Sequence, residues 1–300
     1  TIATMNLYDT VLYPDAEEGV VPWIAESWEA SEDKMSYTIV LRDDVPFHDG
    51  TMIDAEDVAF SMRRAVMMPS MIGGFVRNVD AENIEVLDER TVRFNLTTLD
   101  PAFLRALTWL RVVNRDVVME HIADGPYGEF GDFGSGWLKT NAAGSGPYRL
   151  DDFTTSVGIE MTAFEDYPLE EWSPDAPKRV ELEIIPEFVT IETKAMAGEF
   201  DVNLFTPAPP RIEAFRETGD FDFYSWQTVN TYYMTMNTTK PPLDDVNIRK
   251  AISHAYERDT VMNKIFAGGV PLKGPVPEIL MGGEGSCEGL AGYDYDLDKA

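Results

Sequence analysis

The first third of the chain shows strand-like and then helix-like hydrophobic periodicity. Ser36–Arg42 alternates polar and apolar side chains, which predicts a β-strand with one buried face. Asp54 is a candidate N-cap for the helix that follows, with Asp57 at its third helical position, and Pro69 ends it. The apolar face of this helix consists of Val58, Met62, Ala65 and Val66. A strand followed by an amphipathic helix indicates an α+β block.

A hairpin and two further helices complete this first block. Ile84–Leu87 and Thr91–Leu96 are apolar runs on either side of the polar turn Asp88–Arg90, a pattern typical of an antiparallel hairpin. Helices are expected to begin at Pro101 and near Asn114, because both residue types are common where helices start.

The segment that follows is rich in glycine. Seven glycines lie within the 24 residues from Asp124 to Pro147 with little periodic apolar signal, which predicts a long surface loop ending in a connector. Four strands are expected beyond it, at Tyr148–Phe153, Gly158–Phe164, Arg179–Pro186 and Asp201–Phe205. A helix is expected at Thr190–Gly198, closed by the glycine. A second α+β block is therefore predicted.

The last part of the chain combines a strand, a break and two helices. Thr231–Asn237 is predicted as a strand, and Lys240–Pro242 then breaks the chain. Val246–Tyr256 and Arg258–Phe266 are predicted as a helical pair. Gly268–Gly292 has the glycine and proline content of a loop. The fold class predicted for the whole chain is α/β, of the mixed α+β type.

The net charge of the chain limits the kinds of molecule that it can bind. Its 300 residues include 24 basic and 53 acidic side chains, which gives a formal net charge of −29, and 44% are hydrophobic. The apolar fraction suffices for a folded core, and the negative charge repels phosphates, so nucleic acid is excluded as a partner. The chain contains no run of about 18 apolar residues, so no membrane-spanning helix is predicted. Thr1 is not an initiator, and we expect any targeting segment to have been removed before this numbering begins.

Sequence signatures of catalysis are weak. His48 followed by Asp49 suggests a base with an acidic partner, but Asp49-Gly50 is typical of the tip of a turn, and we interpret it as structural. No G-x-S-x-G sequence offers a serine nucleophile. Carboxylate pairs such as Asp151-Asp152 are expected on any surface with 53 acidic residues. No catalytic residue is predicted, and the chain is not expected to be an enzyme.

Metal-binding patterns are equally weak. The three histidines lack the spacing of zinc ligands; they are His48, His121 and His254. Asp294, Asp296 and Asp298 imitate the first ligands of a calcium loop, but Lys299 occupies the position where such a loop needs glycine. Cys287 is the single cysteine, so no internal disulfide can form. No metal or other cofactor is predicted.

Seven stretches in a fixed order carry a resemblance to a known family. They are LYDTVL at 7–12, PWIAESWEASEDKMSYTIVLRDDVPFHDGTMIDAEDVAFSMRR at 22–64, TVRFNL at 91–96, GSGPYRL at 144–150, AGEFDV at 197–202, MNTTKPPLDDVNIRKAISHAYERDTVMNKIFAGG at 236–269 and YDYDLDKA at 293–300. In this order they resemble the family 5 extracellular solute-binding proteins over nearly the whole chain. The resemblance implies a two-lobed, type II periplasmic binding protein fold with an extra small domain. It also implies a monomeric receptor, periplasmic or extracellular, that delivers peptides, nickel or oligosaccharides to an ATP-driven importer.

The same resemblance implies a domain organisation and a set of partners. Because family members are longer at both ends, it implies that the chain is a fragment. It divides the chain into a remnant of the large lobe at 1–11, a small α+β domain at 12–143, a large-lobe sheet domain at 144–237 and the start of the second lobe at 238–300. The implied partners are a peptide or small-molecule ligand, a membrane permease and its ATPase subunits.

Candidate ligand contacts lie where the family faces its cleft. The resemblance places the edge of the large-lobe sheet at residues 226–233, where alternate strand residues share one face. The candidates there are Trp226, Thr228, Asn230, Tyr232 and Tyr233. The loop Pro69–Asn78 matches the part of the small domain that leans over the ligand, with Phe75 as the best candidate. Met67, Met68 and Met71 are candidates for an adaptable apolar wall. The alternative for both groups is ordinary core packing.

Two crossings between the implied domains are candidate hinges. Residues 144–147 resemble the family's passage from the small domain to the large lobe. There Gly144 and Gly146 would admit unusual backbone angles, and Pro147 would stiffen the exit. Asn237 lies at the second crossing. We expect ligand-driven closure to bend the chain at both places.

The sequence leaves the class of ligand open. Peptides are the first expectation, because they are the commonest ligands of the family. Oligosaccharides are the second, since the chain has six tryptophans, whose indoles suit sugar faces. A remote alternative from another class is a glycoside hydrolase with two catalytic carboxylates, and a third is a sensor without an importer.

Overall fold

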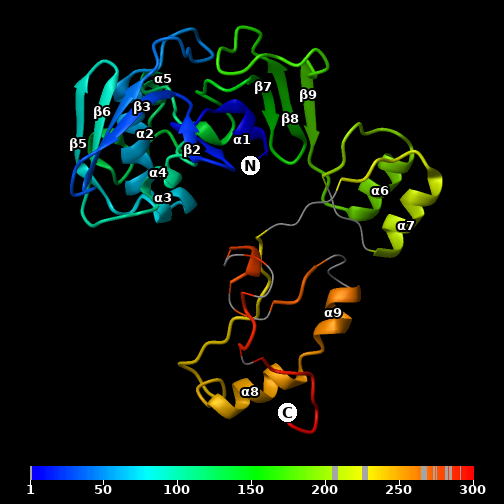
Figure 1. Cartoon of the computed structure of the whole chain (residues 1–300). Coiled ribbons are helices and arrows are strands. Elements are labelled where there is room, and N and C mark those ends of the chain that lie inside the picture. The colour runs from blue at the N-terminus through cyan, green and yellow to red at the C-terminus, as the bar shows by residue number, and fades with distance from the viewer. Residues whose placement is uncertain are drawn as a thin grey trace. The chain divides into compact units, whose positions relative to one another are not determined.

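A computed structural model describes residues 2–204, 209–224, 229–264, 269–272, 274, 276–280, 283, 286–290 and 292–300. The chain forms two compact units, Thr1–Pro186 and Glu187–Ala300 (Figure 1). The four-part division expected from the resemblance stays a prediction.

The first unit contains a four-stranded antiparallel sheet. Its strands are β3 (Ala25–Ala30), β4 (Ser36–Leu41), β5 (Val79–Asp88) and β6 (Thr91–Leu96), in the order β3-β4-β6-β5. Along β4 every second residue is buried, so Tyr37, Ile39 and Leu41 face the core as the alternation predicted. The predicted hairpin is confirmed as β5 and β6, with Val86 opposite Val92.

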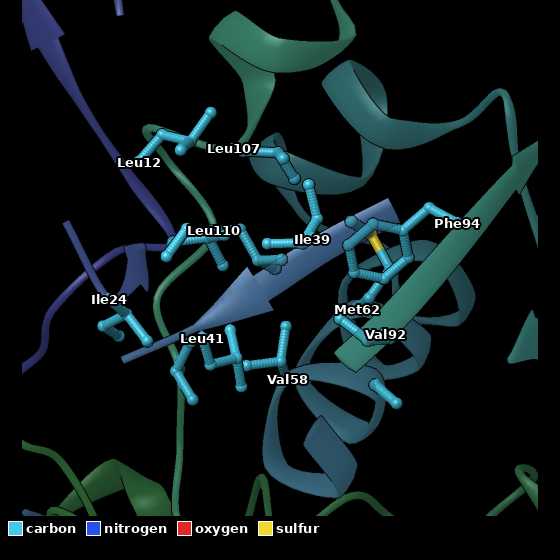
Figure 2. Close-up of a cluster of buried hydrophobic side chains, with 14 of the residues drawn as sticks. Leu12, Ile24, Ile39, Leu41, Val58, Met62, Val92, Phe94, Leu107 and Leu110 are labelled. Carbon is cyan, nitrogen blue, oxygen red and sulfur yellow. The ribbon is translucent and has the colours of Figure 1, made fainter. Parts of the chain in front are cut away.

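Helix α2 (Ala55–Met67) covers this sheet, and its predicted start is confirmed. The Asp54 side chain accepts hydrogen bonds from the backbone N–H groups of Glu56 and Asp57, and the Asp57 side chain accepts one from the Asp54 N–H, so the two residues form a capping box. Val58 and Met62 are fully buried and face β4 and β6 (Figure 2). Burying each such side chain contributes about 1.5–3 kcal/mol to folding.

The carboxylate of Asp57 also holds a second helix. Its Oδ1 accepts a hydrogen bond of 2.7 Å from the Arg115 N–H, the first residue of α5 (Arg115–Glu120). Asn114 is the N-cap of α5, as predicted, because its side chain accepts a hydrogen bond from the Val117 N–H. Burial raises the pKa of Asp57 to about 7. One buried side chain therefore joins the first turns of α2 and α5.

Several short elements surround this core. They are α1 (Ile2–Leu7), the hairpin β1 (Leu12–Asp15) and β2 (Gly19–Pro22), α3 (Met71–Val76) and α4 (Phe103–Ala106). The helix expected from Pro101 begins two residues later as α4. The segment Pro69–Asn78 was expected to be a loop, and this is wrong. Ser70 caps α3 by accepting a hydrogen bond of 3.0 Å from the Gly73 N–H. The helix was not expected because Gly73 and Gly74 lie within it, and glycine disfavours helices.

The glycine-rich segment 124–147 forms no α-helix or strand, as expected of a loop, but part of it is buried and not on the surface. Phe133 is fully buried and packs with Phe60, Val118 and Ala143 in a separate hydrophobic cluster. Two 3₁₀ turns, Gly128–Phe130 and Trp137–Lys139, shape the segment. Several of its glycines have positive φ angles, so they provide tight turns that carry the chain around this buried ring.

A three-stranded antiparallel sheet completes the first unit. Its strands β7 (Tyr148–Thr154), β8 (Gly158–Ala163) and β9 (Arg179–Glu183) are in the order β7-β8-β9, which confirms three of the predicted strands. Helix α1 buries Ala3 and Leu7 against Tyr148 and Met161 of this sheet. The N-terminal residues and the segment after residue 147 therefore share one core.

The second unit is helical in its described parts. It contains α6 (Phe188–Met196), α7 (Pro209–Thr218), α8 (Val246–Ala255), α9 (Arg258–Lys264) and the 3₁₀ turn Glu278–Leu280. The glycine stop of α6 is confirmed by Gly198 at φ +72°. Asp245 caps α8, whose predicted existence is also confirmed, as is that of α9. No helix among the residues described here has both the length and the apolar character needed to cross a bilayer.

Two strands predicted for this region are wrong. Residues 201–204 and 229–237 form no strand, and Phe205 lies outside the described residues. Val202 and Leu204 are 73% and 63% exposed, so their apolar side chains have no sheet to pack on. A strand is stable only beside a hydrogen-bonded neighbour, and the local pattern carries no information about such a neighbour.

Candidate ligand-binding site

An exposed aromatic pair marks one surface of the first unit. Phe75 of α3 and Trp109 stack with ring centroids 6.3 Å apart and an angle of 27° between the rings. Both are large apolar side chains, yet Phe75 is 51% and Trp109 is 46% exposed. Flat rings of this kind give a ligand contact area at a low cost in conformational entropy. Phe75, a predicted contact, thus lies at the surface together with Trp109, which was not predicted from the sequence.

The chain around Trp109 alternates between buried and accessible side chains. Leu110 and Val112 are 2% and 0% exposed, whereas Trp109 is exposed and Arg111 is of intermediate burial. The backbone at Arg111 forms an isolated antiparallel bridge with Thr10. Trp109 itself lies in the turn that follows α4, where its N–H donates to the Ala106 oxygen at 3.0 Å.

Arg111 has an unusual environment for an arginine of this chain. Its Nε atom is buried and has no hydrogen-bond partner among the described residues. Burial lowers the pKa of its guanidinium. By contrast, Arg90 contacts the carboxylates of Glu26 and Asp43. Arg111 was not among the residues predicted from the sequence, although a single arginine between the apolar residues Leu110 and Val112 was a signal that could have identified it.

The three methionines predicted as an apolar wall do not act together. Met67 and Met71 are 41% and 69% exposed. Met68 is partly buried and packs on the cluster around Phe133. Met67 and Met71 therefore lie at the surface near α3. Met68 packs in the core, which was the alternative interpretation of these methionines.

The other predicted ligand contacts belong to the second unit. Trp226 and Thr228 lie outside the described residues. Asn230, Tyr232 and Tyr233 are exposed, with Tyr232 and Tyr233 at 77% and 80%. The prediction that these side chains share one face required a strand, and residues 229–237 form none. Their contact with ligand stays a prediction.

The predicted hinge at Gly144 and Gly146 is tightly packed in the first unit. Neither glycine has a φ in the left-handed region. A Cβ atom on Gly146 would lie 2.7 Å from the Leu7 carbonyl carbon and still closer to the Asn6 oxygen, and one on Gly144 would meet the Leu7 oxygen. Glycine is therefore required here for close approach of two backbones, and the expected reason, unusual backbone angles, is wrong.

Hydrogen bonds hold this crossing on several sides. The Gly146 N–H donates to the Leu7 oxygen at 3.1 Å, and the Pro147 oxygen accepts from the Phe164 N–H at 2.8 Å. His48 contributes two contacts, because its backbone N–H donates to the Gly144 oxygen and its Nε2 lies 2.9 Å from the Gly146 oxygen. Burial lowers the pKa of His48, and the contact of its ring with the Gly146 oxygen acts in the opposite direction.

A buried carboxylate, Asp9, lies at the centre of the same crossing. Its Oδ1 accepts hydrogen bonds from Trp23 Nε1 at 3.0 Å and the Tyr167 hydroxyl at 2.7 Å, and its Oδ2 accepts one from the Ser145 hydroxyl at 2.8 Å. Asp9 is 4% and Ser145 is 0% exposed. Burial raises the pKa of Asp9 despite these three donors. The network joins four separate segments of the chain.

The remaining hinge candidate and the His48-Asp49 pair have local structural roles. Asn237 Oδ1 accepts hydrogen bonds from the N–H and the hydroxyl of Thr239, which closes a turn. Asp49 accepts from the Thr51 N–H and from Asn114, not from His48. Gly50 has a φ of +91°, so the interpretation of this tetrapeptide as a turn is confirmed. Bending at Asn237 stays a prediction.

The residues that sequence patterns suggested as metal ligands have other contacts in the structure. Within the described ranges, no group of three or more histidine, cysteine or acidic residues is arranged to hold a metal ion. Asp296 of the acidic ladder instead accepts hydrogen bonds from the backbone N–H groups of Asp298 and Lys299 and pairs with the Lys299 ammonium at 3.0 Å.

Comparison with known proteins identifies the class to which the chain belongs. Residues 19–300 match the family model described as bacterial extracellular solute-binding proteins, family 5 Middle, and the chain belongs to this family. The family resemblance and the fold class expected from the sequence are thereby confirmed.

Individual relatives cover the chain almost completely. The probable D,D-dipeptide-binding periplasmic protein DdpA of Escherichia coli is 28% identical over 92% of this chain and 51% of its own length. The dipeptide-binding protein of the same organism is 26% identical over 94% of this chain and 54% of its own length. NikA from Brucella suis in complex with Fe(III)-EDTA is similar in structure, with a TM-score of 0.76 and 25% identity over 99% of this chain and 57% of that chain. The chain thus spans about half the length of the curated relatives it matches.

Proposed function

We propose that the protein is the solute-binding receptor of an ABC-type importer, and that it captures an oligopeptide and delivers it to the permease. The family match over residues 19–300 is the observation that carries this proposal. The exposed Phe75–Trp109 pair supports it, because it offers a flat apolar surface that folding leaves uncovered. Proteins of this kind bind a solute between two lobes and release it unchanged.

A peptide is the ligand class that the relatives favour. The two Escherichia coli relatives are named as dipeptide-binding or D,D-dipeptide-binding. NikA was solved with a different kind of molecule, so the fold alone does not select the ligand. The tryptophans give little support to an oligosaccharide, because Trp23 and Trp172 use their indole N–H groups within the fold, for Asp9 and the Phe164 oxygen.

The proposed partners and location follow from the same family. We place the protein in the periplasm or outside the cell, acting as a monomer with a membrane permease and its ATPase subunits. This agrees with the periplasmic location in the name of one relative. It also agrees with the net charge of −29, which disfavours anionic partners such as nucleic acid.

Native mass spectrometry of the purified full-length protein tests the proposed function directly. We expect a co-purified mass that matches a short peptide and disappears after mild denaturation and refolding. Calorimetry with alanyl-phenylalanine is then expected to show saturable binding with no heat of turnover. Steady conversion of the peptide to products would identify an enzyme instead and would contradict the receptor function.

Truncation of the aromatic pair is expected to weaken ligand binding without unfolding the protein. Phe75→Ala or Trp109→Ala in the full-length protein should weaken the binding of alanyl-phenylalanine about tenfold, since exposed aromatic anchors often contribute more than 1 kcal/mol each. Calorimetry measures this change. Leu99→Ala is the matched control, because Leu99 is 56% exposed on the same unit. Equal affinities for all three variants would show that the pair does not contact ligand.

A further inference from the structure

We propose that Ser61 is a positioning residue of the ligand site, because its buried hydroxyl fixes the segment 110–114 and thereby holds Trp109 in its stack with Phe75. The inference rests on the proposed receptor function, in which this aromatic pair contacts the ligand. Ser61 lies within α2 and is 3% exposed, so it acts through the segment and does not touch the ligand itself.

The first argument is the contact that the Ser61 side chain makes. Its Oγ accepts a buried hydrogen bond of 3.0 Å from the Val113 N–H, 52 positions further along the chain. The neighbours of Ser61 in the helix, Phe60 and Met62, are apolar and buried. A hydroxyl in such a place is costly unless it is hydrogen-bonded, and serine is no better than neutral inside a helix. The Val113 N–H is the donor that explains a serine here.

The second argument is a match of spacing between α2 and the segment. Asp57 lies one helical turn before Ser61, and its Oδ1 accepts from the Arg115 N–H at 2.7 Å. Residues four apart on a helix share a face and are about 6 Å apart along its axis. The N–H groups of alternate residues in an extended chain point to one side and are about 6.6 Å apart. The two acceptors of α2 therefore fit the amides of Val113 and Arg115 in one register.

The third argument is that the intervening amides are held as well. The Val112 N–H donates to the Asp9 oxygen at 3.0 Å, and the Asn114 N–H donates to the Ala143 oxygen at 2.9 Å. Four consecutive amides thus have defined acceptors, and a slip by one residue would present each of them to the wrong side. Because the acceptors of these two are backbone oxygens, the Ser61 hydroxyl is a point where a small substitution can loosen the register.

The fourth argument is the rigid connection from this segment to Trp109. Leu110 is 2% exposed and lies in the main core (Figure 2). The backbone of the next residue, Arg111, is bridged to Thr10. A displacement at Val113 is therefore passed on to Trp109, because residues in a close-packed core have little room to absorb it.

A double-mutant cycle tests the proposal. The affinity for alanyl-phenylalanine is measured by calorimetry, well below the melting temperature, for the full-length protein, Ser61→Ala, Trp109→Ala and the double variant. We expect Ser61→Ala to weaken binding about three- to tenfold, since a displaced Trp109 loses part of its contact. In the Trp109→Ala background the same substitution should change the affinity by less than about twofold, because the side chain that Ser61 positions is absent.

Two further variants separate positioning from stability. Met161→Ala removes a side chain that is 1% exposed in the cluster of the second sheet, so it lowers stability without touching the segment and should leave the affinity unchanged. Ser61→Cys keeps a weaker acceptor at the same position, so an intermediate affinity is expected. This variant replaces Ser61→Ala in the cycle if the latter does not fold.

The outcomes distinguish the inference from the function on which it rests. Unchanged affinity in Ser61→Ala overturns the inference alone, as does an equal loss in both backgrounds of the cycle. A loss in Met161→Ala as large as that in Ser61→Ala overturns it too, because reduced stability would then account for the effect. Failure of the unmodified protein to bind the peptide contradicts the proposed peptide receptor and the inference with it.

Discussion

Asp9→Ala is expected to lower the free energy of unfolding by about 3–5 kcal/mol, because three donors, two of them in buried hydrogen bonds, lose their acceptor at once. The donors are Trp23 Nε1 and the hydroxyls of Tyr167 and Ser145. Urea unfolding followed by tryptophan fluorescence measures the change. Asp166→Ala is the control for the loss of one negative charge, since Asp166 is exposed and should change stability by no more than about 0.5 kcal/mol.

Asp9→Asn distinguishes the hydrogen bonds from the charge. The asparagine oxygen can still accept from Trp23 and Tyr167, and the Ser145 hydroxyl can turn to accept from the amide, so the loss should be well below that of Asp9→Ala. Equal losses for the alanine and asparagine variants would show that the network contributes little.

The asparagine variant also gives a pH dependence. Burial raises the pKa of Asp9 in the folded protein, so the folded state binds this proton more tightly than the unfolded chain does. The stability that the proton contributes is fully present below the unfolded pKa and is lost as the pH rises through the folded one. Asp9→Asn lacks this titration, so its stability deficit relative to the unmodified protein should be larger at pH 4 than at pH 7.

Gly146→Ala is expected to destabilise the first unit by about 3 kcal/mol, the upper end of the cost of overpacking. The added methyl group would meet backbone atoms of Asn6 and Leu7, which cannot turn aside as a flexible side chain can. Chemical denaturation measures the loss. Gly74→Ala is the matched control, because nothing lies within 4 Å of a Cβ atom there and its φ is not in the left-handed region. Since Gly74 lies in α3, alanine should leave stability unchanged or raise it by up to about 1 kcal/mol. Equal stability of the two alanine variants would show that the crossing tolerates a side chain.

The tight packing at Gly146 changes how a hinge at this position must be understood. A bend there has to break or carry along the hydrogen bonds to Leu7, His48 and Phe164. We propose that the segment moves as part of a rigid body, with rotation at its margins. Small-angle scattering of the full-length protein with and without ligand tests this: if Gly146→Ala folds and still compacts normally, the glycine itself is not the pivot.

Local chemistry made much of the first unit predictable from the sequence. The alternation in Ser36–Leu41 and the capping box of Asp54 and Asp57 depend on residues within a few positions of one another, and both are confirmed. The second unit was less predictable, because the strand-like segment 229–237 needs a neighbouring strand that its own pattern does not specify. The glycines of 124–147 suggested solvent exposure, whereas their turns serve to bury Phe133.

The candidate site was predictable only in part, for a related reason. Phe75 was found because the resemblance indicated its loop. Trp109 and Arg111 come from a different part of the chain. The sequence carries no direct sign that Trp109 stacks on Phe75, or that Arg111 Nε lacks a hydrogen-bond partner among the residues that the structure describes. The Asp9 network was missed likewise, since its donors are 14, 136 and 158 residues away from Asp9.

The shared cap at Asp57 makes two helices one cooperative unit. Its carboxylate accepts hydrogen bonds from the Asp54 N–H before α2 and from the Arg115 N–H that begins α5, two amides separated by 61 positions in the chain. When the first turn of either helix unfolds, the Asp57 carboxylate no longer holds the first turn of the other. The free energy of local unfolding is therefore expected to be the same for both first turns. Amide hydrogen exchange in the first turns of α2 and α5 should therefore proceed at matching protection levels, although nothing in their separate sequences links them.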